Sequence, residues 1–511
     1  MRMQYFLGID VGTSGTKSLI MDARAKVLAT ATAEHPIYAP KPGWSEQKPE
    51  QWWASTVASV RTVIKKAKIN AKAIAAVGFS GQMHGLVITD AAGKVLRPSL
   101  IWNDQRTAVE AAEIEAAVGG KKNLIKLVGN QAQTSFTLTK LMWVRKHEPK
   151  IYDRIKHFLL PKDYIRLKMT GEYVGDVSDM SGTLMLDQRK RTWSKEIISK
   201  FQIDASILPP LVESHEVTGK LTAAAASELG MAAGTLVVGG GGDQPVGAVG
   251  NGVVKAGLTS ASMGTSGVVF THSRKYATDP ESRVGTFCAS VAGEYCMFGC
   301  ILSAGGSYQW FRNVLGAAEI AQAKKQGVDP YELLTAQAQK APAGCEGLFF
   351  LPYLTGERTP HGDPNAKACW IGIHSRTTRN ELVRSVLEGV TFAMNDAVAL
   401  LRKQVGTISQ VRLSGGGARS EFWRQLQADI YGAPCATINC HEGPAYGAAL
   451  LASVGGGAFK DIRQACAAGI KVTRTVKPNA KSKALYAKLY TQYAQLYPAL
   501  KDQFANIAKL H

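Results

Sequence analysis

Short apolar runs alternate with longer segments of helical periodicity along most of the chain. The first part predicts a β-meander, with strands at Tyr5–Ile9, Lys17–Met21 and Val27–Thr32. A helix is expected from about Pro49 to Lys68, because proline suits a first helical turn and one face is apolar. Another strand is predicted at Ile74–Phe79. This alternation of strands and helices predicts an α/β fold.

The second half of the chain repeats the plan. Strands are expected around Leu258–Phe270, Tyr295–Cys300 and Gln410–Leu413. Helices are expected to begin near Ser307 and Asn380. A last helix is predicted at Ser482–Leu510, where apolar residues recur at helical spacing.

A chain of 511 residues predicts two large domains, each with its own core. The buried strand predicted at Leu236–Val238 leads into a run of glycines and then into Gly247–Gly252. We place the boundary there, which gives an N-terminal domain of residues 1–248 and a C-terminal domain of residues 249–511.

Two loops with a common Gly-Thr-Ser core lie far apart in the chain, in GIDVGTSGTKSLIMD (Gly8–Asp22) and in SASMGTSGVVF (Ser260–Phe270). Each predicts a hairpin whose tip offers backbone N–H groups and hydroxyls to an anion. Two such hairpins suggest two halves that hold one polyphosphate, which indicates an ATP-dependent kinase. The candidate phosphate contacts are Gly12, Thr13, Ser14, Lys17, Gly264, Thr265 and Ser266.

Two aspartates are the candidates for phosphoryl-transfer chemistry. Asp10 lies beside the first hairpin, where a carboxylate needs a cation between itself and a phosphate, so Mg²⁺ is implied. Asp243 follows the glycines Gly239–Gly242 and is the candidate general base for a sugar hydroxyl. The plainer alternatives are an Asx turn at Asp10 and a flexible linker at Asp243.

Two pairs of residues suit a sugar ligand, which has apolar carbon faces and polar hydroxyls. Met83 and His84 follow a predicted strand end, a common position for ligand contacts in α/β sheets. Trp102 and Asp104 offer a ring for stacking and an acceptor for hydroxyls.

The glycines Gly415 and Gly416 would let adenosine lie against the backbone. The chain has no Walker A sequence, which excludes a P-loop mechanism.

Composition and charge indicate which binding partners and which cellular location to expect. The net charge is +20, but lysine and arginine are spread along the chain and no nucleic-acid-binding motif is present, so we expect no nucleic-acid partner. The longest apolar stretch, near Tyr295–Phe311, is interrupted by polar and glycine residues, so we expect no membrane partner. The N-terminus has no signal-peptide pattern, and the eight cysteines suit free thiols, so a cytoplasmic location is expected.

Several longer motifs resemble those of the FGGY carbohydrate kinases, within the actin/hexokinase/Hsp70 superfamily. SFTLTKLMWVRKH (Ser135–His147) is similar to the first family signature and GIHSRTTRNELVRSVLE (Gly372–Glu388) to the second. Within the family, GQMHG (Gly81–Gly85), WNDQR (Trp102–Arg106) and GGGDQPVGAVG (Gly240–Gly250) are most similar to the xylulokinases.

That resemblance implies two ribonuclease-H-like domains with a catalytic cleft between them. It implies Asp243 as the general base, Asp10 as the magnesium-linked aspartate, and Met83 and His84 as ketopentose contacts. The reaction implied is phosphorylation of D-xylulose by ATP, and a homodimer is expected. The residues at family nucleotide contacts are Thr265, Gly305, Gly416 and Ser420.

At two positions the sequence departs from the pattern of related kinases, so other functions stay open. Gln244 stands where xylulokinases commonly carry Asn, and Ser420 stands where glycerol kinases use Asn near adenine. Since Gln244 would face the substrate, a kinase for glycerol, ribulose, gluconate or erythritol is the main alternative. Alternatives of another class are a non-kinase ATPase and a non-catalytic sugar-sensing protein.

Overall fold

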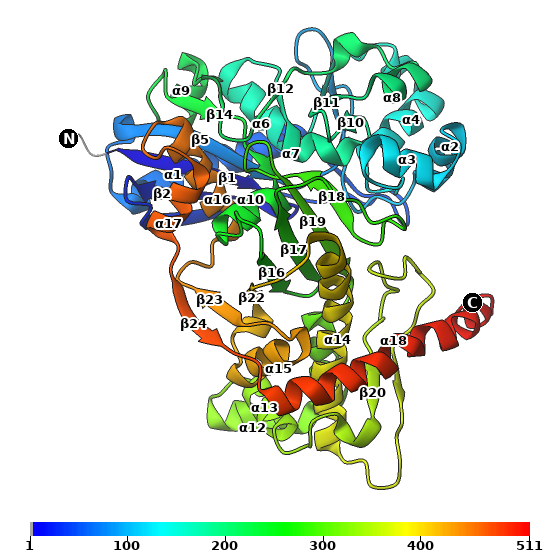
Figure 1. Cartoon of the computed structure of the whole chain (residues 1–511). Coiled ribbons are helices and arrows are strands. Elements are labelled where there is room, and N and C mark those ends of the chain that lie inside the picture. Colours follow the sequence, from blue (N-terminus) through cyan, green and yellow to red (C-terminus); the bar gives the residue numbers. More distant parts are fainter. Residues whose placement is uncertain (1–3, 511) are drawn as a thin grey trace.

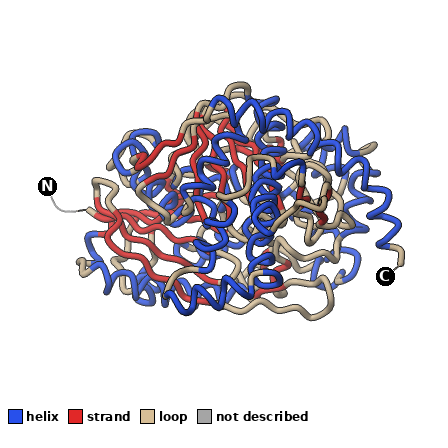
Figure 2. Tube along the Cα trace, turned by 90° about the horizontal axis from the view of Figure 1, so that it is seen from below, coloured by secondary structure: helices blue, strands red, loops and turns tan. Residues whose placement is uncertain are grey.

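The computed structural model describes residues 4–510 and has two lobes, each built around a mixed seven-stranded sheet (Figure 1). Helices lie around the strands of both sheets (Figure 2). We call the lobe around the first sheet the N-lobe and the lobe around the second the C-lobe.

The N-lobe sheet has the order β13-β14-β5-β1-β2-β3, and β15 also pairs with β5. The first three strands form an antiparallel meander, as expected, and β5 and β14 then add in parallel. Its strands are β1 (Tyr5–Val11), β2 (Gly15–Asp22), β3 (Val27–Glu34), β5 (Ile74–Gly81), β13 (Val217–Lys220), β14 (Leu236–Val238) and β15 (Gly241–Gly242).

The C-lobe sheet has the order β18-β19-β17-β16-β22-β23-β24. Here too an antiparallel meander is followed by two parallel strands on its other side, so β19-β17-β16-β22-β23 repeats the order β3-β2-β1-β5-β14. The expected α/β class with two domains of like fold is confirmed. The strands are β16 (Leu258–Met263), β17 (Gly267–Ser273), β18 (Gly285–Cys288), β19 (Tyr295–Ile301), β22 (Gln410–Gly415), β23 (Cys435–Ile438) and β24 (Val472–Val476).

Long helices cover these sheets. α1 packs on β2 and β3, whereas α14 packs on β17 and β19. The expected helices form close to their predicted bounds: α1 has a proline in its first turn, and the side chains of Thr378 and Asn479 cap α14 and α18. They are α1 (Pro49–Ala67), α11 (Gly305–Leu315), α14 (Arg379–Val405) and α18 (Ala480–Ala508). Helix α15 (Glu421–Tyr431) lies between β22 and β23 in the chain.

One helix crosses between the two halves of the sequence. α16 (Gly443–Gly455) follows the C-lobe strand β23, but packs on β1 and β5 of the N-lobe (Figure 1). It also packs along α10 (Asp243–Gly250), which directly follows β15. The division of the chain at residues 248 and 249 stays a prediction.

Smaller helices surround the strand ends and loops. The ones used below are α4 (Thr137–His147), α6 (Pro161–Thr170), α13 (Pro330–Ala338) and α17 (Ile462–Gly469). The others are α2 (Ala108–Ala117), α3 (Lys121–Val128), α5 (Pro149–Tyr152), α7 (Val177–Met180), α8 (Lys195–Lys200), α9 (Ala223–Leu229) and α12 (Ala317–Gln326). Between residues 4 and 510, none of the helices has both the length and the apolar character that crossing a membrane requires. All eight cysteines are free thiols.

Candidate active site

Three adjacent strands bring the two candidate aspartates to one edge of the N-lobe sheet. Asp10 on β1 pairs in register with Ser80 on β5, and Ser80 pairs with Gly241 on β15. Asp243 then opens helix α10 two residues later. The carboxyl ends of parallel strands are the usual place for a ligand site in such a sheet, and these residues lie there.

The glycines before Asp243 are required by close packing. A Cβ atom on Gly240, which has φ of +74°, would lie 2.5 Å from the carbonyl oxygen of Phe79. A Cβ atom on Gly242 would lie 2.7 Å from Cγ of Met83. Gly241 and Gly242 are buried and paired with β5. The run therefore forms a packed strand end, not the flexible linker that was the alternative reading of the sequence.

The two aspartates share a poorly solvated environment. Burial raises the pKa of Asp10 to about 6, although Ser80 and Lys17 act in the opposite direction. Burial, and then the charge of Asp10, raise the pKa of Asp243 to about 7. Oδ1 of Asp10 is buried and accepts no hydrogen bond from any group in residues 4–510. The paired carboxylates thus form a site that a cation would stabilise.

The two Gly-Thr-Ser loops are hairpin tips at equivalent places, between β1 and β2 and between β16 and β17. In the first, the Gly12 N–H donates to the Gly15 carbonyl at 3.0 Å. In the second, the Gly264 N–H donates to the Ser266 carbonyl at 3.0 Å. Lys17 forms an ion pair with Glu442, so its charge is already matched in this conformation.

Trp102 and Asp104 point to different partners. The Trp102 indole N–H donates to Oγ1 of Thr13 at 2.9 Å, which attaches the ring to the first hairpin, next to Ser14. The carboxylate of Asp104 is fully buried and accepts hydrogen bonds from the Arg106 guanidinium and the Ser45 N–H. Asp104 therefore has a structural role here, and its contact with a sugar stays a prediction.

A cavity of about 350 Å³, here called the interlobe cavity, lies beside His84. The N-lobe contributes His84, Ser135 and Phe136, and the C-lobe contributes Phe287 and Arg358. The His84 ring packs edge-on against the Phe136 ring, with 4.7 Å between centroids. The cavity therefore joins aromatic walls to polar groups, as a sugar site requires.

His84 is held as a neutral imidazole. Its burial, and then the charge of Lys140, lower its pKa to about 3. Nδ1 lies 3.1 Å from the Gly182 carbonyl, so Nδ1 carries the proton and donates. Nε2 is therefore an acceptor, suited to a hydroxyl donor. Met83, which is 4% exposed, packs beside Gly242 and so lies next to Asp243, which Gln244 follows.

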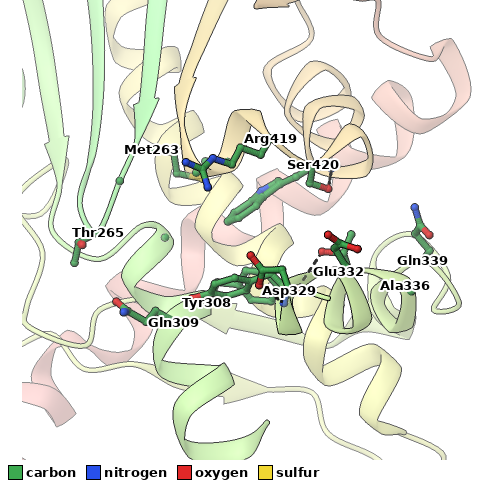
Figure 3. Close-up of a pocket in the computed structure, with 17 residues that line it drawn as sticks. Met263, Thr265, Tyr308, Gln309, Asp329, Glu332, Ala336, Gln339, Arg419 and Ser420 are labelled. Atoms are coloured by element: carbon green, nitrogen blue, oxygen red, sulfur yellow. Dashed lines mark hydrogen bonds between the residues drawn. The ribbon is translucent and has the colours of Figure 1, made fainter. Parts of the chain in front are cut away.

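A larger cavity of about 730 Å³, here called the C-lobe cavity, contains five of the predicted nucleotide contacts (Figure 3). These are Gly264, Thr265, Gly305, Gly416 and Ser420. A Cβ atom on Gly305 would lie 2.5 Å from the Gly264 carbonyl, so the close approach of α11 to the second hairpin requires glycine. Ser420 also caps α15, accepting from the Trp423 N–H at 3.2 Å.

The sequence predictions missed part of both cavities. Figure 3 shows Tyr308, Asp329 and Glu332 on the side of the C-lobe cavity opposite Arg419. The segment GERTPHGDP (Gly356–Pro364) contributes five residues to the interlobe cavity, from Arg358 to Gly362. Its unusual density of charged, turn-forming and histidine residues was a signal that could have identified it.

Arg358 is the most informative of the missed residues. Burial raises the pKa of the Cys300 thiol. The charge of Arg358 lowers that pKa and the charge of Asp243 raises it, so both side chains lie near Cys300. Within residues 4–510, Arg358 forms no ion pair, although it is half-buried. In the same range, no group of three or more His, Cys, Asp or Glu side chains could hold a metal ion by itself.

Comparisons with known proteins agree with this geometry. Residues 5–250 match the N-terminal domain of the FGGY family of carbohydrate kinases, and residues 259–456 match its C-terminal domain. The chain is 38% identical to a xylulose kinase of Escherichia coli (strain K12), over 97% of this chain and 99% of that protein. It is 35% identical to a xylulose kinase of Bacillus subtilis (strain 168), over 98% of both.

Solved structures give the same result. A xyloylose kinase from Brucella ovis is 36% identical, with a TM-score of 0.89, over 98% of this chain and 100% of that one. A gluconate kinase from Lactobacillus acidophilus is 26% identical, with a TM-score of 0.92, over 99% and 100%. The chain therefore belongs to the FGGY family of carbohydrate kinases and is itself a carbohydrate kinase.

Proposed function

We propose that this kinase phosphorylates D-xylulose with ATP, giving D-xylulose 5-phosphate and ADP. One contact carries the proposal: Gly242 packs against Met83, so the Met83–His84 pair lies next to Asp243. A ketopentose in the interlobe cavity would meet the His84 imidazole as a hydrogen-bond acceptor, and it would reach the Met83 thioether by extending toward Asp243. The similarity to several xylulose kinases supports this acceptor.

Asp243 is the proposed general base. It would orient the terminal hydroxyl of the sugar and take its proton while the hydroxyl oxygen bonds to the γ-phosphorus of ATP. The bond from that phosphorus to the β–γ bridging oxygen breaks, and ADP leaves. Its position at the start of α10 lets the helix dipole stabilise the ionised form.

ATP is proposed to bind in the C-lobe cavity, with its phosphates toward the hairpin at Gly264, Thr265 and Ser266. The N-lobe hairpin at Gly12, Thr13 and Ser14 would approach the phosphates from the other side when the lobes close. Closure would also exclude water, which otherwise competes with the sugar as acceptor. Gly416 lines the cavity and is proposed to lie against adenosine, whereas Gly415 adopts a φ of +78° and approaches the Met263 carbonyl, from which a Cβ atom would lie 2.4 Å away.

The residues present fit a magnesium ion bound together with the nucleotide. Mg²⁺ keeps several water ligands and uses one or two carboxylates plus substrate phosphates. Asp10 would hold it, because its buried Oδ1 lacks a hydrogen-bond donor. When bound, the ion would neutralise charge on the phosphates.

The acceptor sugar has a second candidate. Gln244 directly follows the proposed base Asp243 in the chain. A different side chain at this position would alter how the sugar hydroxyl fits beside the base. The similarity to a gluconate kinase keeps an aldonate acceptor as the second candidate, because Arg358 is an unpaired cation facing the same cavity. Glycerol, ribulose and erythritol complete the set to be compared.

The test is an ADP-release assay with ketopentoses, polyols and aldonates, each read against a blank without acceptor. D-xylulose is expected to give the highest kcat/KM. Gluconate as the best substrate would replace the proposed acceptor with the second candidate. The same ADP release with and without any acceptor would overturn the proposal of a sugar site in the interlobe cavity.

A further inference from the structure

The first family signature, Ser135–His147, contains a buried cation that takes no part in the chemistry described above. Lys140 lies in the first turns of α4 and is fully buried. Within residues 4–510, its ammonium forms no ion pair with a carboxylate. Burial lowers its pKa to about 7. Burying an unpaired charge is costly, so a lysine at this place calls for a specific role.

The ammonium is bound by two backbone carbonyls. Nζ of Lys140 donates to the carbonyl of His84 at 2.9 Å and to the carbonyl of Ser135 by a shorter hydrogen bond. Both of these residues line the interlobe cavity. Lys140 thus ties together two segments of the cavity wall that are far apart in the chain.

His84 has a backbone that needs such support. Its φ is +70°, in the left-handed region that costs most residues other than glycine free energy. The same carbonyl accepts a second hydrogen bond, from Oγ1 of Thr137 at 3.2 Å. The first turn of α4 therefore supplies two donors that hold the peptide after His84 in one orientation.

This orientation decides where the imidazole points. With the peptide fixed, Nδ1 reaches the Gly182 carbonyl and the ring packs against Phe136. Nε2 is then the atom left for a ligand. We propose that Lys140 is a positioning residue, which holds His84 in its left-handed conformation so that the imidazole accepts a hydrogen bond from the sugar.

The inference rests on the proposed sugar site, and Lys140→Met tests it. The KM for the sugar is expected to rise about tenfold, the loss of one charged hydrogen bond, while the KM for ATP changes by less than about twofold. Lys146→Met is the matched control, because Lys146 lies on the same helix with its side chain 47% exposed. Calorimetric sugar binding gives a readout that does not need turnover.

A double-mutant cycle separates positioning through His84 from a general structural effect. In a His84→Ala background, Lys140→Met should add little to the sugar KM, because the side chain it positions is already gone. Additive effects of the two substitutions would overturn the proposal. If Lys140→Met does not fold, Thr137→Val should raise the sugar KM in the same direction by a smaller factor, and no change there would also overturn it.

The two proposals fail in different ways. An unchanged sugar KM in His84→Ala would remove the sugar from this part of the cavity and overturn the proposed function. A raised sugar KM in His84→Ala together with wild-type values in Lys140→Met would leave the sugar site in place and overturn only the positioning role.

Discussion

Asp243 and Asp10 illustrate how single residues obtain their chemistry from their surroundings. Neither carboxyl is unusual in the sequence, but burial raises the pKa of both, and the charge of Asp10 raises that of Asp243 further. A base whose pKa lies near neutrality is well matched to proton transfer. The assignments of these side chains stay predictions, which substitutions can test.

Asp243→Ala should lower turnover by about 10²–10⁴-fold, the usual contribution of a positioned base. The KM for ATP should change little, because the C-lobe cavity is untouched. Steady-state kinetics with the preferred sugar check this, with circular dichroism to show that the variant is folded. Turnover equal to that of the wild type would contradict the assignment.

Arg358→Met should reduce kcat/KM for the sugar by at least about tenfold, because an unpaired cation in the interlobe cavity is lost. Arg376→Met is the control, since Arg376 is 80% exposed and lies outside this cavity. Kinetics on both variants make the comparison. Equal activity of the two would place Arg358 outside the productive complex.

The pairing of α10 with α16 shows how two helices fix the place of the base. They cross at glycines: a Cβ atom on Gly250 would lie 1.9 Å from the Gly443 carbonyl, and one on Gly447 would lie 2.0 Å from the Val246 carbonyl. Such approach is possible only without side chains. α16 also packs on β1 and β5, so this crossing connects the start of α10 to the strands that carry Asp10 and Ser80.

Gly250→Ala should destabilise the protein by about 1–3 kcal/mol, because the helices must separate. Gly247→Ala in the same helix is the matched control, since its Cβ atom would meet Pro444 at 3.4 Å, an ordinary contact. Thermal unfolding of both variants measures the difference. Similar Tm values would show that the crossing tolerates a methyl group.

Asp396 links α14 to the last helix by accepting from the Tyr490 hydroxyl at 2.6 Å. Burial raises its pKa to about 7, above its ordinary value of 3.8. Because the folded state binds the proton more tightly than the unfolded state, ionising Asp396 destabilises the fold as the pH rises from about 4 to 7. That cost is fully present about one pH unit above the folded pKa.

Asp396→Asn cannot ionise and keeps an acceptor for Tyr490. Its stability gain over the wild type should therefore grow by about 2 kcal/mol between pH 5.5 and about pH 8 and then stay level. Urea unfolding at several pH values follows this. A gain that falls as the pH rises would show that Asp396 is stabilising as a carboxylate.

At the scale of the whole molecule, hydrogen bonds join the two lobes near the interlobe cavity. Asn130 of the N-lobe and Thr286 of β18 exchange two hydrogen bonds, at 2.8 and 3.0 Å. The N–H of Cys288 on β18 donates to Oγ of Ser181 at 2.9 Å. β18 therefore anchors this edge of the C-lobe sheet to the N-lobe, and α16, which follows β23, packs on the N-lobe from the other side of the sheet.

Binding of both substrates should lower the radius of gyration, as the two hairpins approach one nucleotide. Small-angle scattering of an Asp243→Asn variant with ATP and sugar, compared with each ligand alone, measures the change without turnover. An unchanged radius would mean that the lobes already stand at their catalytic distance. The same samples report molecular mass, which tests the homodimer that stays a prediction.

Local patterns in the chain were enough for the elements and the class of fold. Apolar periodicity placed the meanders and the long helices, and the glycine turns placed both Gly-Thr-Ser hairpins, because strand and helix periods depend on neighbouring residues. The same reasoning identified Asp10, Asp243 and His84 as candidates, because each follows directly on a strand or a glycine run.

Contacts between distant segments were beyond the reach of such patterns. Four examples depend on such tertiary contacts: the packing of α16 on the opposite lobe, the hydrogen bond from the Ser45 N–H to Asp104, the approach of Arg358 to the cavity, and the support of His84 by Lys140. Periodicity shows which face of an element is buried but not what covers it. The pKa values of the buried groups depend on that covering, and so does the chemistry they can perform.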